Sequence, residues 1–243
     1  MEVRKKVVET EFGRISFLEA GSGSKTIVFL HGMWGWIFGR IAIFPWLAER
    51  YAPRGYKILV PSLPGHWGSF LIPQGYTFPQ MVATMKSFLE IVGAYKKTIV
   101  IGHSLCGSTG LVVGSQLGIK KIIAIDPMVY FFKDAPAHRI AGWIIDRCKD
   151  WFGKPGPKIG SVTDVIVYVL FWKRYWDLLK TIDVRSFLKR WTVLFCGRED
   201  HLCPLDKFKE EMQYCRIITF SGGHWWYNFQ KERLLDELDK FIQ

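Results

Sequence analysis

The stretch from Thr98 to Gly110, with the sequence TIVIGHSLCGSTG, constrains the fold more than any other part of the chain. It begins with a short run of apolar and β-branched residues typical of a buried strand, and the residues from Leu111 onward predict a helix. Ser104 stands between these two elements. A serine on a sharp strand-to-helix turn needs small residues two positions before and after it, because the two backbones approach closely there. Gly102 meets this requirement, whereas Cys106 replaces the usual glycine and fits only approximately.

Short apolar strands alternate with helices along most of the chain. The predicted strands cover residues 3–9, 15–19, 26–30, 56–60, 98–101, 121–125, 191–196 and 216–220. The predicted helices between and after them cover residues 44–51, 78–92, 111–117, 208–214 and 229–241. This alternation predicts an α/β fold with a doubly wound, mostly parallel sheet and an antiparallel opening pair of strands. Ligands of such sheets bind at the carboxyl ends of the strands.

The alternation stops between residues 128 and 188. Helical spacing at 134–151, and a capping-box sequence at 161–164 before the apolar segment 165–176, predict helices without a long strand. We therefore expect a core of residues 1–127 and 189–243 and a helical cap of residues 128–188. The cap holds the densest group of aromatic residues, some of which would line an apolar pocket over Ser104. The side chains expected to contact a substrate are Trp34, Phe131, Trp143, Phe171, Trp172 and Trp225.

Composition favours one folded domain in a reducing compartment. The chain has 243 residues, of which 49% are hydrophobic and 23% charged, enough for a sizeable core and unlike a disordered protein. No apolar run of signal-peptide length follows the first residues, and the longest oily run, 165–172, is too short to cross a bilayer. Five cysteines without CxxC spacing predict no disulfide framework. We expect a soluble, cytoplasmic protein.

The net charge of +11 raises the question of an anionic partner. The basic residues occur in scattered pairs such as Lys5-Lys6, Lys96-Lys97 and Lys120-Lys121, without a long cationic block. Such a pattern is typical of a solvated basic surface, and it also suits peripheral contact with an anionic lipid surface. Nothing in the sequence resembles a nucleic-acid-binding module. The oligomeric state stays open.

Three residues that together activate a serine follow predicted strands in the order Ser104, Asp200, His224. A serine hydroxyl becomes a good nucleophile when a base removes its proton, and the base needs a third group that fixes its tautomer. The serine, the acid and the base are all placed where strand ends would bring them to one edge of the sheet.

This order and the mid-chain serine turn resemble the α/β-hydrolase family, and the resemblance covers nearly the whole chain. His31-Gly32 is similar to the family's oxyanion loop, and Ser62-Leu63-Pro64-Gly65-His66 to its DLPGHG loop. The segment from Gly197 to Pro204 is similar to its acid turn, and Ser221-Gly222-Gly223-His224-Trp225 to its histidine turn. Four ordered motifs are more specific than a Gly-x-Ser sequence alone.

The resemblance implies a catalytic role for each of these three residues. Ser104 would attack an acyl carbonyl, His224 would take and return its proton, and Asp200 would orient His224 and stabilise its cation. The backbone N–H groups of Leu105 and Met33 would form the oxyanion hole, with Trp34 as the alternative to Met33.

Other polar residues near these positions offer alternatives. Glu199, and Asp126 at the end of the preceding strand, compete with Asp200 for the role of the acid. His201 and Cys203 could suggest a metal pair, but two further well-spaced ligands are lacking, so we expect no metal and no cofactor. His31, His66 and His103 are expected to be structural, and His201 a rim residue.

The sequence departs from the family pattern outside the three candidate catalytic residues, so these departures bear on the subfamily and the substrate. Ser62 replaces the aspartate of the DLPGHG loop, and Trp67-Gly68 shifts its second glycine by one place. A serine nucleophile disfavours the epoxide hydrolases and haloalkane dehalogenases, which use aspartate. The resemblance implies a serine esterase or lipase-like hydrolase acting on a small apolar acyl ester. A C–C bond hydrolase, a lactonase, a thioesterase, or a ligand-binding member with vestigial turnover remain the alternatives.

Overall fold

The computed structural model describes residues 2–32, 43–129, 178–179, 181–187, 192–201, 203, 205–211 and 214–242. Several predicted features lie outside these ranges. They are the candidate oxyanion residue Met33, its alternative Trp34, the predicted helices 134–151 and 165–176, and the candidate substrate-binding residues Phe131, Trp143, Phe171 and Trp172.

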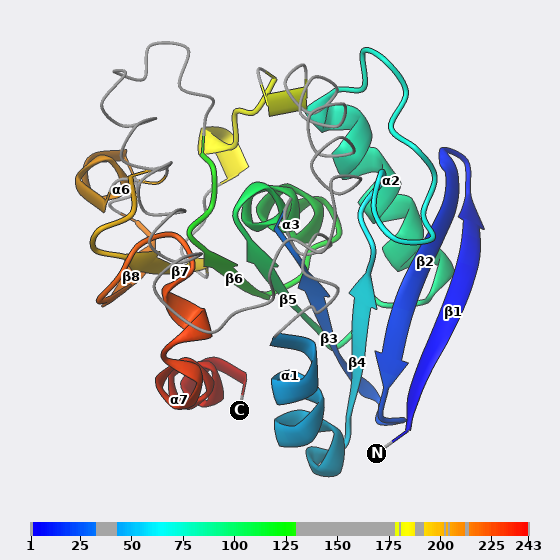
Figure 1. The fold of residues 1–243 in the computed structure, drawn as a ribbon, viewed down its shortest axis with the longest axis horizontal. Coiled ribbons are helices and arrows are strands. Elements are labelled where there is room, and N and C mark those ends of the chain that lie inside the picture. The colour runs from blue at the N-terminus through cyan, green and yellow to red at the C-terminus, as the bar shows by residue number, and fades with distance from the viewer. Residues whose placement is uncertain are drawn as a thin grey trace, which may run out of the picture.

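An eight-stranded sheet forms the centre of the fold, in the order β1-β2-β4-β3-β5-β6-β7-β8 (Figure 1). The strands are β1 (Val3–Thr10), β2 (Gly13–Ala20), β3 (Lys25–Leu30), β4 (Tyr56–Pro61), β5 (Thr98–His103), β6 (Lys121–Ile125), β7 (Thr192–Gly197) and β8 (Arg216–Phe220). β2 pairs antiparallel with β1 and β4, and all pairs from β4 to β8 are parallel. The mostly parallel α/β sheet predicted from the sequence is thereby confirmed.

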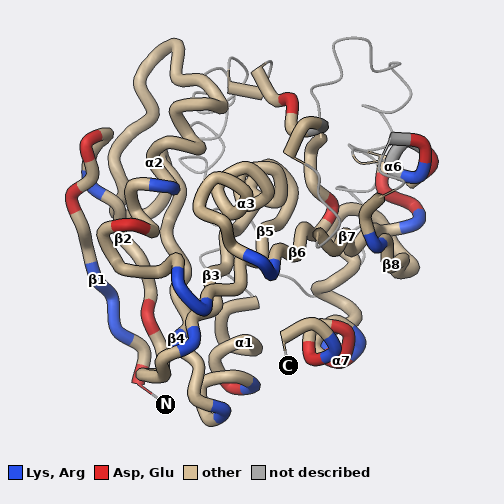
Figure 2. The backbone as a smooth tube through the Cα atoms, turned by 180° about the vertical axis from the view of Figure 1, so that it is seen from behind, with Lys and Arg blue, Asp and Glu red and all other residues tan. Residues whose placement is uncertain are grey.

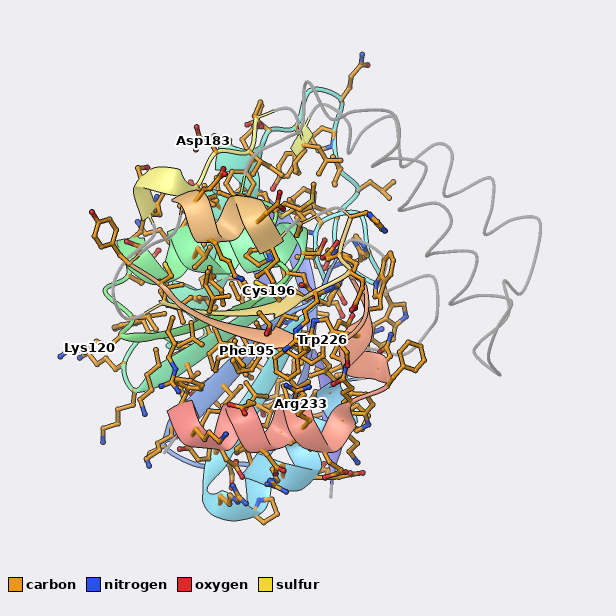
Figure 3. The ribbon with its side chains drawn as sticks, turned by 90° about the vertical axis from the view of Figure 1, so that its left-hand side faces the viewer. Lys120, Asp183, Phe195, Cys196, Trp226 and Arg233 are labelled. Carbon is orange, nitrogen blue, oxygen red and sulfur yellow. The ribbon has the colours of Figure 1, made fainter. Side chains whose placement is uncertain are left out.

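Helices cover both faces of this sheet (Figures 1 and 3). They are α1 (Ile43–Tyr51), α2 (Phe78–Ile91), α3 (Leu105–Gln116), α6 (Leu205–Glu211) and α7 (Lys231–Ile242). One apolar cluster contains buried residues of α2 and α3, and the other contains those of α1 and α7. Parallel strands that are covered on both faces have continuous apolar sequences, and the buried residues Ile27–Leu30 of β3 are an example. Among the described residues, no helix is long and apolar enough to cross a membrane.

The structure corrects three predicted helix boundaries. The helix after the serine begins at Leu105 instead of residue 111, and α6 begins at Leu205 instead of residue 208. The last helix starts at Lys231, after a 3₁₀ turn at Trp226–Asn228. The sequence does not indicate the start of α3, because Gly, Ser and Thr are weak helix formers. Burial of residues 105 to 114 overrides that preference.

The described ends of the predicted cap pack on the core. Met128, Val129 and Leu178 belong to the apolar cluster on the α2/α3 side of the sheet. The Val184 N–H donates to the Val129 carbonyl at 3.0 Å, which joins the two ends of the segment. The helical cap itself stays a prediction, because residues 130–177 lie outside the described ranges.

Candidate active site

Ser104 occupies a sharp turn between β5 and α3 at the carboxyl edge of the sheet. Its backbone has φ 56° and ψ −128°, which a side-chain-bearing residue adopts only when its surroundings hold it there. Its N–H donates to the Ile125 carbonyl of neighbouring β6 at 2.9 Å. The hydroxyl is therefore displayed at a fixed point above the sheet, as a nucleophile elbow requires.

β5 and α3 approach each other closely at two glycines, Gly102 and Gly107. A Cβ on Gly102 would lie 2.1 Å from the Cys106 carbonyl oxygen, and one on Gly107 would lie 2.9 Å from the Pro127 Cβ. The group of Cys106 that faces Gly102 is its backbone carbonyl, while its side chain is fully buried in the α2/α3-side cluster. The turn therefore accommodates a cysteine at residue 106. The small residue that the sequence pattern requires there is needed at residue 107 instead.

Ser104, His224 and Asp200 form a continuous hydrogen-bonded chain. The His224 Nε2 lies 2.8 Å from the Ser104 Oγ, and its Nδ1 lies 2.7 Å from the Asp200 Oδ2. The exposed fractions of the three residues are 6%, 3% and 4%, so water competes little for these contacts. With the Nδ1–H donated to the carboxylate, the Nε2 lone pair is free to accept the serine proton.

The turn after β7 distinguishes Asp200 from its neighbour Glu199. The Asp200 Oδ1 accepts the Cys203 N–H at 3.1 Å, which orients the carboxylate toward His224. The exposed Glu199 accepts the Gly222 N–H with its side chain, and its own N–H donates to the Gly222 carbonyl at 3.2 Å. Glu199 therefore braces the loop before His224, and Asp200 contacts the imidazole.

Aromatic packing holds the loop that carries His224. The Trp226 ring stacks on Phe220 with centroids 3.6 Å apart, and the Arg233 guanidinium lies over the same phenyl ring at 4.7 Å. Trp226 and Arg233 are labelled in Figure 3. Trp225 meets the His224 ring edge-on at 4.9 Å and is 6% exposed. The expected contact of Trp225 with substrate stays a prediction.

His103, predicted to be structural, supports His224 directly. Its Nε2–H donates to the His224 carbonyl at 3.1 Å, and its Nδ1 lies 3.4 Å from the Tyr227 hydroxyl. Burial, and then the nearness of His224, hold the pKa of His103 well below its ordinary value. A neutral imidazole thus joins the serine turn to the histidine turn. Sequence reasoning had no signal for Tyr227, since its contact depends on how the two loops meet.

His31, which directly follows β3, packs edge-on against His66 with ring centroids 5.0 Å apart. The His31 Nδ1–H donates to the Gly32 carbonyl at 2.8 Å, and its Nε2 accepts the Leu63 N–H at 3.3 Å. Burial, helped by the neighbouring His66, lowers the pKa of His31 to about 3. The Leu105 N–H, an expected donor of the oxyanion hole, is at the first position of α3, where a backbone N–H lacks an intrahelical acceptor.

Among the described residues, two groups of buried side chains lie close enough together to hold a cation. They are His103, Asp126 and His224, and Asp200, Cys203 and His224. Both groups share His224, whose two ring nitrogens already contact Ser104 and Asp200. The expectation of no metal and no cofactor stays a prediction. His201 is exposed, as expected of a rim residue.

The model of the alpha/beta hydrolase family matches residues 27–237. The chain therefore belongs to the alpha/beta hydrolase family. A curated relative, the dihydrolipoyllysine-residue acetyltransferase component of the acetoin cleaving system of Cupriavidus necator, is 30% identical over 110 residues. That match covers 44% of this chain and 26% of the relative, so the chain spans about a quarter of that protein's length.

Solved structures with the same fold include several hydrolases. An esterase from Exiguobacterium antarcticum has a TM-score of 0.72 at 17% identity, with 98% of this chain and 99% of that one covered. A putative aryl esterase from Burkholderia cenocepacia has a TM-score of 0.71 at 18% identity, with 98% of each chain covered. A thioesterase domain from the curacin biosynthetic pathway has a TM-score of 0.68 at 16% identity, with 98% and 99% covered. At these identities the likeness concerns the fold.

Proposed function

We propose that the chain is a serine hydrolase that cleaves a small apolar acyl ester through an acyl-enzyme. The observation that carries this proposal is the buried hydrogen-bonded chain from Ser104 through His224 to Asp200. Membership of the alpha/beta hydrolase family supports the reaction class. No cofactor or metal takes part in the proposed reaction.

In the proposed reaction, His224 takes a proton from each attacking group and returns it to each departing group. The Ser104 Oγ attacks the ester carbonyl while His224 Nε2 takes the hydroxyl proton, and Asp200 stabilises the resulting imidazolium. The Leu105 N–H would donate to the developing oxyanion. His224 then protonates the departing alcohol, and a water molecule deprotonated by His224 releases the acid and restores Ser104.

The apolar character of the substrate is proposed from the aromatic residues expected in the cap. Beside the serine, the Met128 N–H donates to the Ser104 carbonyl at 3.3 Å, and Met128 and Val129 are buried in the same apolar cluster as Leu105. An acyl chain held by the cap would gain roughly 0.8 kcal/mol for each methylene group that it buries.

The test is hydrolysis of nitrophenyl esters of increasing acyl length by the wild type, Ser104→Ala and the control Ser115→Ala, which lies on the same helix. We expect Ser104→Ala to lose on the order of 10⁶-fold in turnover, and Ser115→Ala to match the wild type. Equal, slow rates for all three proteins would contradict the hydrolase proposal and favour a ligand-binding member. A preference for matched thioesters would change the substrate class and leave the role of Ser104 intact.

A further inference from the structure

A further buried carboxyl group, that of Asp126, lies beside the proposed triad. Asp126 follows the last residue of β6 at the carboxyl edge of the sheet, and its side chain is fully buried. Its backbone φ of 43° is unusual for a residue with a side chain. Sequence reasoning raised Asp126 only as an alternative to Asp200, yet both carboxyl groups are buried at this site.

Asp126 lies beside the hydrogen-bonded side chains of the proposed triad. One of its carboxyl oxygens and one ring nitrogen each of His103 and His224 all lie within 4.8 Å of one another. Its Oδ1 accepts the Gly197 N–H at 2.7 Å, and the Gly197 carbonyl accepts the Asp200 N–H at 3.4 Å. The same turn after β7 therefore fixes the side chain of Asp126 and the backbone of Asp200.

Cys203 connects the same two residues from the other side. Its N–H donates to the Asp200 Oδ1 at 3.1 Å, and its thiol donates to the Asp126 main-chain carbonyl at 3.2 Å. These contacts hold the two aspartates as one unit.

The hydrogen bonds decide which of the two carries the negative charge. Asp200 accepts N–H groups from His224 and Cys203, whereas Asp126 accepts one, from Gly197. The Asp126 Oδ2 is buried without a donor in good hydrogen-bond geometry among the described residues, and the nearby Trp226 indole N–H lowers the pKa of this carboxyl group less than burial and Asp200 raise it. Neighbouring carboxyl groups removed from water cannot both be ionised, so the less stabilised one keeps a proton. In agreement, burial and then repulsion by Asp200 raise the pKa of Asp126 well above its ordinary value.

We propose that Asp126 is a positioning residue, a neutral carboxylic acid that donates its O–H to the Asp200 carboxylate while accepting the Gly197 N–H. This inference rests on the proposed function, because it makes Asp126 act through the acid of the triad. The donated hydrogen bond holds Asp200 toward the His224 Nδ1–H without adding a second charge beside the imidazole. An ionised Asp126 would instead compete with Asp200 for the same ring.

Two variants of similar size test whether Asp126 acts as a neutral hydrogen-bond donor or as an ionised acid. Asparagine can donate to Asp200 with its NH₂ group and accept the Gly197 N–H with its carbonyl, whereas leucine can do neither. We expect Asp126→Asn to keep kcat/KM within about threefold of the wild type, and Asp126→Leu to lose roughly 10- to 100-fold. An Asp126→Asn variant as impaired as Asp126→Leu would overturn the proposal.

A spectroscopic measurement keeps the test independent of turnover and of how well Asp126→Leu folds. Infrared spectra at neutral pH should show the carbonyl stretch of a protonated carboxyl group in the wild type and in the control Asp206→Asn, a residue exposed on α6. The band should be absent from Asp126→Asn. A wild type without this band would overturn the proposal even if the ester assays succeed. If the ester assays fail while the band is present, the proposed function fails and the neutral state of Asp126 is retained.

Discussion

The residues at the two ends of β5 have similar positive φ angles in opposite surroundings. Lys97, just before the strand, has φ 52°, and Ser104, just after it, has φ 56°. Lys97 is exposed, whereas Ser104 is buried and hydrogen-bonded to β6. A residue with positive φ thus lies in an exposed connection at one end of the strand and at the centre of a packed site at the other. The conformation alone does not mark a functional residue, and the packing around it does.

The amino and carboxyl edges of the sheet differ in the same way, one exposing charged groups and the other burying polar groups. Lysines gather at the amino ends of four neighbouring parallel strands (Figure 2). They are Lys25, Lys57, Lys96, Lys97, Lys120 and Lys121. Figure 3 shows Lys120 projecting outward at this end. The carboxyl edge instead buries polar groups that must find partners inside the protein, which fixes where each one lies. Peripheral contact of the protein with an anionic lipid surface stays a prediction.

After the loss of Ser104 itself, removing the charge of the proposed acid should have the largest effect on turnover. Asp200→Asn should lower kcat by about 10⁴-fold, because an amide stabilises the imidazolium poorly and favours the wrong tautomer of His224. The control is Glu199→Gln, whose exposed side chain contacts the Gly222 N–H and should leave kcat nearly unchanged. A comparable loss in Glu199→Gln with little loss in Asp200→Asn would move the acid to residue 199.

The close packing of the elbow predicts a large effect on stability. A Cβ on Gly102 would lie 2.1 Å from a backbone oxygen, so Gly102→Ala should lower the free energy of unfolding by about 3 kcal/mol or more. Gly118→Ala is the matched control, since its φ of 66° is strained but nothing lies within 4 Å of its Cβ position. It should cost about 1 kcal/mol. Equal losses in urea unfolding would contradict the packing described for the carboxyl edge.

The buried histidines predict how stability changes with pH. His31 stays neutral in the folded protein, with its pKa lowered to about 3, while the unfolded chain takes up a proton below about pH 6.5. The free energy of unfolding should therefore fall as the pH falls from about 6.5 to 4.5, by up to about 1.4 kcal/mol per pH unit from this residue. His31→Gln should have a slope shallower by that amount, whereas the exposed His201→Gln should keep the wild-type slope. Identical slopes in all three proteins would show that His31 is not held neutral.

The amino end of β5 predicts the smallest change. Lys97→Gly should raise the free energy of unfolding by up to about 1 kcal/mol, because relief of the left-handed strain exceeds the entropy cost of glycine. The melting temperature should rise by roughly 2–4 °C. A fall in melting temperature would mean that the Lys97 side chain contributes more than its exposure indicates.

Local patterns were sufficient to predict most of the sheet. Continuous apolar runs such as residues 26–30 and 121–125 identified the buried parallel strands, and the ordered motifs identified Ser104, Asp200 and His224. Those motifs predict spatial neighbours because the carboxyl ends of parallel strands meet at one edge.

Features that depend on how distant loops meet could not be predicted from the sequence. The start of α3 at Leu105 depends on burial that overrides weak helix formers, and the fit of Cys106 depends on which of its groups faces Gly102. The support of His103 by Tyr227 joins residues 124 positions apart. The pairing of Asp126 with the turn after β7 likewise joins residues 71 positions apart.

Covalent trapping of the proposed nucleophile tests the central claim most directly. The wild type and Ser104→Ala would be treated with an alkyl phosphonate ester that reacts with activated serines, and the modified residue located by peptide mass spectrometry. Ser108, buried on the same helix and hydrogen-bonded to the Met128 carbonyl, is the internal control. We expect one phosphonyl group on Ser104 of the wild type, none on Ser108, and none on Ser104→Ala. A wild type that stays unmodified, or carries the group on another residue, would contradict the account.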